Sequence, residues 1–421
     1  MKDIFFFLKK EKKFNFPILI ISFFPIIFFL GSGVINFFII LLDLIFLIEI
    51  IKNKRLFILK NIFFYLLIVF WAILIINLYF SIDYQNSLGR SLGFIRFIIL
   101  VFAFQYYLNY MKCKYQNIVF KTWCLTFFII SVDLIYEFSF GKNIFGYSSY
   151  MPGRLSGFFN DELKIGYLYS SLILFSLSYL FIFFFKERKN IIKKNSFFDN
   201  KNIFYFLIFF SLFVSFIIGE RSNFLKALII VFFFIFLVDQ KYIYRKIIIL
   251  FSFFLILFLI ILNSDSYKYR FWTMLIKPGI EKPVSFVKNS NYGQHYMVAI
   301  EVFKNNKIYG VGLKNYREEV KKDIYNKNSS IHPHQVHFEI LAELGLIGYF
   351  YFLIFFVFSL FFSINSFFKE KNIYKLSAIL FVFVNLLPII PTGSFFTTYT
   401  ATIFWINFAI MLPKNRLLNK L

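Results

Sequence analysis

The sequence predicts an all-α membrane protein that crosses the bilayer many times, and its composition, apolar runs and cysteine count support this. Of 421 residues, 59% are hydrophobic and 16% are charged, whereas about 25% are charged in a typical soluble domain. Apolar runs long enough to cross a bilayer recur along the chain. A basic nucleic-acid-binding domain lacks such runs, so the net charge of +24 does not indicate a nucleic-acid partner. Two cysteines cannot build the disulfide framework of a small secreted domain.

About twelve apolar segments have the length of a transmembrane helix. A hydrocarbon core about 30 Å thick is crossed by roughly 20 helical residues. The last two segments are the shortest. We place the helices near residues 14–30, 34–51, 62–80, 92–110, 118–136, 165–185, 203–219, 224–238, 247–263, 345–363, 376–391 and 400–413.

These helices divide the chain into four regions. The large polar loop lies between helices nine and ten and is too long for a passive connector. In it, Tyr316, Val320 and Ile324 recur every four residues, which predicts a half-buried helix. The regions are 1–136 with helices one to five, 137–263 with helices six to nine, 264–344 as the loop, and 345–421 with helices ten to twelve.

The distribution of basic residues predicts the orientation of the chain. Of the 46 lysines and arginines, 27 fall in segments on the same side as the N-terminus, and five fall in the short segments on the other side. Cytoplasmic loops carry an excess of these residues. We therefore expect both termini in the cytoplasm and the large loop on the outer side.

All four histidines lie in or at the end of the large loop, at His295, His332, His334 and His337. Pro333 suits the first turn of a helix, so we expect His334 and His337 one turn apart on one helix face. Three interpretations stay open. The histidines are ordinary surface residues, or the H-x-H-x-x-H spacing ligates zinc, or one histidine is a general base at the outer membrane face.

Arginines give a second indication of a site. Arginine grips phosphate through a bidentate fork and stays charged. Arg154 lies in PGRLSGFFNDELKIG (152–166) with an Asp161–Glu162 pair, and Arg221 lies in GERSNF (219–224). The alternatives are polar turns for these segments and interfacial anchoring for Arg90 and Arg96. The arginines outside or within spans are Arg90, Arg96, Arg154, Arg221, Arg270 and Arg317.

One motif resembles a known family. His334 and Gln335, then nine residues, then GLIGY (345–349) resemble the signature of bacterial O-antigen ligases and polymerases. By itself the GVG at 310–312 indicates only a turn between two loop helices. Three further segments are similar to family patterns: IYGVGLKNY (308–316), GERSNF (219–224) and RLSGFF (154–159).

This resemblance implies a multi-pass enzyme of the bacterial inner membrane with a periplasmic active site. Such enzymes transfer an undecaprenyl-pyrophosphate-linked glycan onto a sugar hydroxyl of lipid A–core, with inversion and without a metal or other cofactor. A polymerase that extends the growing glycan, or an oligosaccharyltransferase acting on proteins, belongs to the same superfamily. From a different class, a twelve-helix secondary transporter stays an alternative, although its polar residues would lie near the bilayer midplane.

The resemblance also assigns roles to residues. It implies that His334 activates the acceptor hydroxyl and that Arg221 binds the pyrophosphate. A second arginine of the large loop is expected to bind the pyrophosphate, either Arg270 or, as the less favoured alternative, Arg317. Arg154 is expected to bind it as well. Supporting roles are implied for His332, His337, Gln335, Glu162 and Arg317.

Overall fold

The structure is a computed structural model. It describes residues 16–110, 113–160, 162–187, 200–238, 243–281, 290–322, 324–325 and 330–413. Every regular element in these ranges is a helix, which confirms the predicted all-α class. The helices divide into two compact units, and each is described by itself.

Among the described residues, six helices are long and apolar enough to cross a membrane. They are Ser32–Lys52, Tyr84–Leu108, Tyr115–Phe140, Ile165–Phe185, Arg221–Val238 and Val336–Glu370. Six shorter apolar helices occupy the other predicted positions: Phe16–Leu30, Ile62–Leu78, Asn202–Ile217, Phe254–Asn263, Ile373–Asn385 and Thr398–Met411. The twelve-span count and the orientation therefore stay predictions, whereas the multi-pass character is supported.

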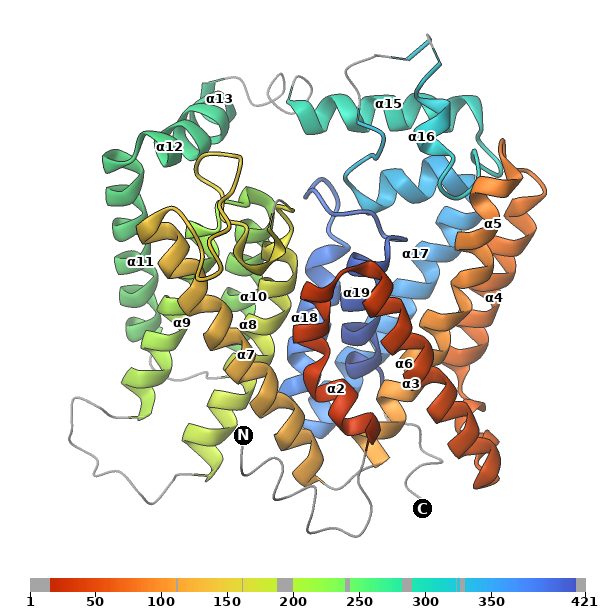
Figure 1. Ribbon diagram of the computed structural model, residues 1–421, viewed down its shortest axis with the longest axis horizontal. Coiled ribbons are helices and arrows are strands. Elements are labelled where there is room, and N and C mark those ends of the chain that lie inside the picture. The colour runs from red at the N-terminus through yellow and green to blue at the C-terminus, as the bar shows by residue number, and fades with distance from the viewer. Residues whose placement is uncertain are drawn as a thin grey trace. The chain divides into compact units, whose positions relative to one another are not determined.

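The first unit comprises residues 1–38, 106–275 and 371–384. Its centre is α8, which packs against α7, α9 and α10 (Figure 1). Serine hydroxyls also join α8 to α18, because Ser178 and Ser377 are hydrogen-bonded. The main helices are α2 (Phe16–Ile27), α7 (Cys113–Phe140), α8 (Ile165–Ile182), α9 (Asn200–Ile217), α10 (Arg221–Val238), α11 (Ile243–Asn263), α12 (Asp265–Tyr267) with the π-helix η5 (Lys268–Ile276), and α18 (Ile373–Asn385).

The second unit comprises residues 39–105, 276–370 and 385–421. Here α15 packs on α17, and α4 packs on α5 and α17 (Figure 1). Two helices, α3 (Ser32–Lys52) and α6 (Ile95–Tyr110), run from one unit into the other. The remaining helices are α4 (Ile62–Leu78), α5 (Tyr84–Gly93), α13 (Lys277–Glu281), α15 (Asn291–Asn305), α16 (Tyr316–Glu319), α17 (Val336–Glu370) and α19 (Thr398–Met411).

The large loop carries helices of its own, as predicted, but their placement differs. The prediction of one helix from Tyr316 to Ile324 is wrong beyond Glu319, where α16 ends. The chain turns after α16, and Ile324 is exposed. Tyr316 and Val320 are buried against residues of α15 and α17. The longest loop helix is α15, which sequence periodicity did not reveal.

Gly345 kinks α17 and separates a short first segment from the long apolar one. Its φ is +64°, and a Cβ there would meet the carbonyl of Ile308. The GVG turn at 310–312 packs on this kink, since the N–H of Val311 donates to Ala342 O (3.0 Å) and that of Gly312 to Glu343 O (2.9 Å). GVG is therefore a structural turn between α15 and α16, as expected. The predicted start of helix ten at residue 345 coincides with the kink.

Candidate active site

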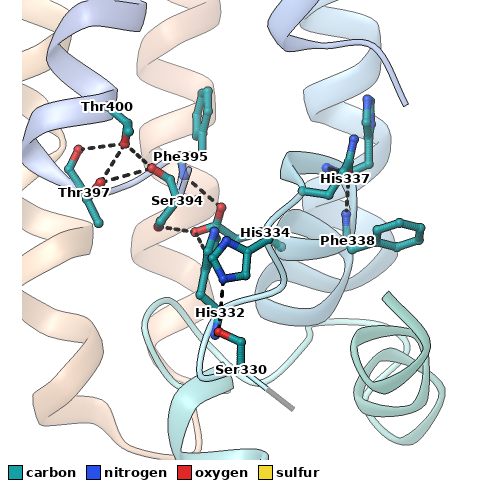
Figure 2. Close-up of polar contacts among 11 residues, drawn as sticks. Ser330, His332, His334, His337, Phe338, Ser394, Phe395, Thr397 and Thr400 are labelled. Atoms are coloured by element: carbon teal, nitrogen blue, oxygen red, sulfur yellow. Dashed lines mark hydrogen bonds and ion pairs between the residues drawn. The ribbon is translucent and has the colours of Figure 1, made fainter. Parts of the chain in front are cut away.

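Three of the four histidines cluster in the second unit. The ring centroids of His332 and His334 are 4.8 Å apart, and those of His295 and His334 are 5.5 Å apart. Ser330 joins them: its hydroxyl lies 3.2 Å from Nε2 of His334, and its N–H donates to Nδ1 of His295 (3.1 Å). Figure 2 shows His332 and His334 with Ser330 beside them. The loop thus presents several imidazole nitrogens within a small volume.

His334 itself has an unusual backbone conformation. Its φ of +56° lies in the left-handed region, which costs a non-glycine residue energy and is often found at functional sites. The surrounding chain holds it there, because the N–H of Thr392 donates to His334 O (2.7 Å). A segment far away in sequence therefore fixes the position of the predicted base.

His337 does not join this cluster, so the expected shared helix face is wrong. The helix begins at Val336 rather than at Pro333. Gln335 explains the later start, because its side-chain oxygen accepts from the N–H of His337 (2.6 Å) and of Phe338 (3.2 Å), as an N-cap does. The His337 ring instead hydrogen-bonds Leu386 O (2.8 Å), and Figure 2 shows it apart from His332 and His334. His337 and Gln335 thus both contact backbone groups, and their supporting roles in the reaction stay predictions.

Zinc ligation by the H-x-H-x-x-H segment requires the rings of His332, His334 and His337 to lie close to one another. Within the described ranges, no group of three or more His, Cys, Asp or Glu side chains is arranged to hold a metal ion. Two of the three clustered rings, those of His295 and His334, contact the backbone N–H and the hydroxyl of Ser330. The role of His334 as a general base stays a prediction.

Sequence reasoning missed a buried carboxylate beside the histidines. Glu339 is 1% exposed and accepts from Ser394 Oγ (2.5 Å) and from the N–H of Phe395 (2.8 Å). Its Oε1 also lies 3.9 Å from Nδ1 of His332. Arg90 interacts electrostatically with both Glu339 and His332. A charged residue inside the apolar run FEILAELGL was the available signal, because an ionisable group in such a run rarely lacks a role.

The clustered histidines are held neutral. Burial, together with the neighbouring His332 and His295, lowers the pKa of His334 to about 4. Burial is also the main reason that the pKa of His332 falls to about 4, and it lowers the pKa of His295. At neutral pH the His334 ring is therefore neutral, and its unprotonated nitrogen can accept a proton.

The first unit brings the three predicted phosphate-binding arginines together. We call the segment 219–221, with the side chains of Arg154, Arg221 and Arg270, the arginine turn. Arg270 donates to Gly219 O (2.8 Å), Arg221 donates to Arg270 O (3.3 Å), and Arg154 lies 3.5 Å from the Glu220 carboxylate. All three side chains are half-buried. Segments about 50 or more residues apart thus converge on one tight turn.

Two glycines allow this convergence. Gly219 has φ +77°, and a Cβ there would collide with the carbonyl of Gly153. Gly153 has φ +71°, and a Cβ there would come within 2.7 Å of Arg270 Cδ. Close approach and positive φ both require glycine. The two loops are further joined by a hydrogen bond from the N–H of Leu155 to Ile218 O (3.0 Å).

The acidic residues near the arginines have different roles. Glu220 is 8% exposed and accepts from the N–H of Gly166 (3.2 Å) and from Asn223 (2.5 Å), so it ties α8 to α10. Glu162 is exposed and pairs with Lys164. Asp161, its predicted partner, lies outside the described residues. The Glu162 contact does not support a direct part in the arginine turn.

Arg317 lies in the other unit from Arg221. It is on α16 of the second unit, where it acts electrostatically on His332. Arg270 shares the arginine turn with Arg221 instead. Which of the two is the second pyrophosphate-binding arginine stays a prediction.

Residues 206–353 match one protein family. It is the O-antigen ligase family. The match supports the resemblance to the O-antigen ligase superfamily that the sequence predicted. It contains Arg221, Arg270 and the histidine cluster, whereas Arg154 and Glu162 precede it. No curated protein matches the chain.

The match to the O-antigen ligase family supports a glycan-transfer function of the ligase or polymerase type. The six candidate membrane helices among the described residues support a membrane location. The match to this family implies that the substrates are lipid-linked glycans.

Proposed function

We propose that the protein transfers a glycan from undecaprenyl pyrophosphate onto a sugar hydroxyl of lipid A–core, at the periplasmic face of a bacterial inner membrane. The observation that carries this proposal is the convergence of Arg154, Arg221 and Arg270 on one turn. Three fixed guanidinium groups suit a pyrophosphate, because each can bind its oxygens through a planar fork.

The proposed reaction is an inverting displacement at the anomeric carbon. His334 accepts the proton of the acceptor hydroxyl through Nε2, the nitrogen that now faces Ser330. The hydroxyl oxygen forms a bond to the anomeric carbon from the side opposite the pyrophosphate. The bond from that carbon to the pyrophosphate oxygen breaks, and its electron pair leaves with the pyrophosphate.

Charge stabilisation and proton transfer are assigned to different residues. The arginine turn of the first unit neutralises the charge that develops on the departing pyrophosphate. The histidine cluster of the second unit supplies the base. Because guanidinium groups provide the fixed positive charge, the proposed step needs no metal ion, and a chelator should leave the rate unchanged.

Deleting the gene and analysing the cell's glycolipids tests the proposal. Long glycan chains left on the carrier, with none on lipid A–core, are expected for a ligase. A single repeat attached to the core would identify a polymerase instead. Unchanged glycolipids would exclude both. Complementation with His334→Ala then tests the base: the protein should insert into the membrane, and the lipid-linked donor should accumulate.

A further inference from the structure

An exposed apolar stripe runs along α7 of the first unit. Its members recur every three or four residues, so they share one face of the helix. Each is between 43% and 71% exposed, although α7 provides one of the six candidate membrane spans. Lipid is the expected neighbour of such a face. The stripe consists of Leu125, Ile129, Val132, Tyr136 and Phe140.

The loop that follows α7 continues this apolar surface with aromatic residues. Four of its side chains are between 42% and 70% exposed. Asn143 holds the loop in shape, because its side chain accepts from the N–H of Phe145 (3.0 Å) and of Tyr147 (2.8 Å) and donates to Gly157 O (2.9 Å). The exposure is thus a property of a hydrogen-bonded loop. The exposed side chains are Ile144, Phe145, Tyr147 and Tyr150.

Residues 265–275 have an inner and an outer face. On the inner face, Tyr267 and Phe271 are buried against Phe216, with ring centroids 5.3 and 4.7 Å from it. The outer face combines apolar and basic groups. Its members are Tyr269, Trp272 and Met274, which are between 41% and 59% exposed, together with the exposed Lys268.

These two segments adjoin each other and the arginine turn. The rings of Phe138 and Tyr267 lie 5.9 Å apart. Arg270 extends inward from the second segment, where its guanidinium contacts Met151 Sδ (3.4 Å) and Gly219 O (2.8 Å). We call the exposed side chains of residues 140–150 and 265–275 the aromatic surface.

We infer that the aromatic surface lies in the headgroup region of the bilayer, with the lipid surface itself as its partner. Tyrosine and tryptophan concentrate at membrane–water interfaces, and exposed lysine beside them favours the same depth. The surface is continuous with the lipid-facing stripe of α7, which favours lipid over a protein partner. The arginine turn is then held at the depth of lipid headgroups, where it meets anions carried on lipids.

This inference can be tested without any activity measurement, so its outcome is independent of the proposed reaction. Single cysteines are introduced at Trp272 and Met274 in a protein lacking Cys113 and Cys124, labelled with a nitroxide and placed in lipid nanodiscs. Lys321, an exposed residue of the large loop, provides the control position. Spectra then compare collisions with oxygen, which dissolves in lipid, and with a water-soluble nickel chelate.

We expect the ratio of oxygen to nickel collisions to be higher at 272 and 274 than at 321. Equal ratios at all three positions would overturn the inference. If the cysteine-free protein does not fold, wild type and Trp272→Phe are compared in nanodiscs made with brominated lipids. The fluorescence that this substitution removes should be quenched more by bromine near the headgroup than by bromine near the chain end. Absence of quenching by either lipid would also overturn the inference.

Discussion

The Oε1 atom of Glu339 lies 3.9 Å from Nδ1 of His332, and the same carboxylate binds Ser394 and the N–H of Phe395. One buried side chain therefore joins the histidine loop to the segment that precedes α19. Thr392 of that segment in turn holds the backbone of His334 (2.7 Å). Glu339 is placed to act on the predicted base through these neighbours and not by direct contact.

Glu339→Ala is expected to destabilise the protein, because it leaves the N–H of Phe395 and the Ser394 hydroxyl without their acceptor. Each unsatisfied buried group costs roughly 1–3 kcal/mol. Thermal unfolding in detergent measures the loss. Glu339→Gln keeps an acceptor oxygen and should retain most of the stability, while Glu301→Gln on the exposed face of α15 serves as the control.

The nitrogen-15 spectrum of the histidines gives a second test of Glu339, since the chain has only four of them. Glu339→Gln should change the signal of His332 and leave that of His337 in place. A spectrum with no change at His332 would show that the carboxylate does not influence the ring.

His334→Ala is expected to abolish glycan transfer, because it removes the nitrogen proposed to accept the hydroxyl proton. The loss should be at least the roughly 10²–10⁴-fold that general base catalysis contributes. His337→Ala removes a hydrogen bond to Leu386 O instead. We expect this variant to be less stable, while the molecules that do fold keep most of their glycan-transfer rate. Equal rate losses in the two variants, both measured per folded molecule, would contradict the assignment.

Arg221→Lys and Arg270→Lys should severely impair transfer, because lysine keeps the charge but lacks the bidentate fork. The apparent KM for the lipid-linked donor and kcat are both measured in a reconstituted assay. Arg317→Lys is the matched control, and its effect should be milder because the hydrogen bonds that form the arginine turn involve Arg221 and Arg270 and not Arg317. If Arg317→Lys alone disabled transfer, Arg317 would replace Arg270 as the second clamp.

Gly345→Ala should prevent the kink in α17 from forming. A Cβ at residue 345 would come within 2.6 Å of Gly310 N, and φ is positive there. A lower melting temperature and a smaller yield of folded protein are expected. Gly89→Ala, inside α5 with open space around it, should instead stabilise by about 0.5–1 kcal/mol. Similar melting temperatures for the two variants would show that the kink does not require glycine.

Acid should weaken the fold between the ordinary histidine pKa near 6.5 and about 4. The folded-state pKa values of His332 and His334 are lowered to about 4, so in this window the unfolded chain binds protons that the folded chain does not. Stability therefore falls as pH falls from about 6.5 toward 4. Transfer itself should persist through pH 6, because the rings stay neutral. A loss of activity centred near pH 6.5 would contradict the lowered pKa values.

Much of the architecture could be predicted from the sequence, because a lipid environment restricts which backbone conformation a membrane-spanning segment can adopt. Backbone groups in a hydrocarbon core must be satisfied within a helix, so long apolar runs predicted helices at all twelve positions. The residues proposed for the site also stand out in the sequence, because His334, Arg221 and Arg270 are polar residues with chemistry that apolar spans do not need. The start of helix ten at residue 345 was predicted from the position where its own apolar run begins.

Tertiary structure alone decided how those residues are grouped. Helical spacing suggested that His334 and His337 face the same way, but Gln335 caps the helix between them and separates the two rings. Arg270 meets Arg221 because Gly153 and Gly219 let two distant loops approach closely. Such contacts depend on backbone conformation and long-range packing, which the local sequence pattern does not determine.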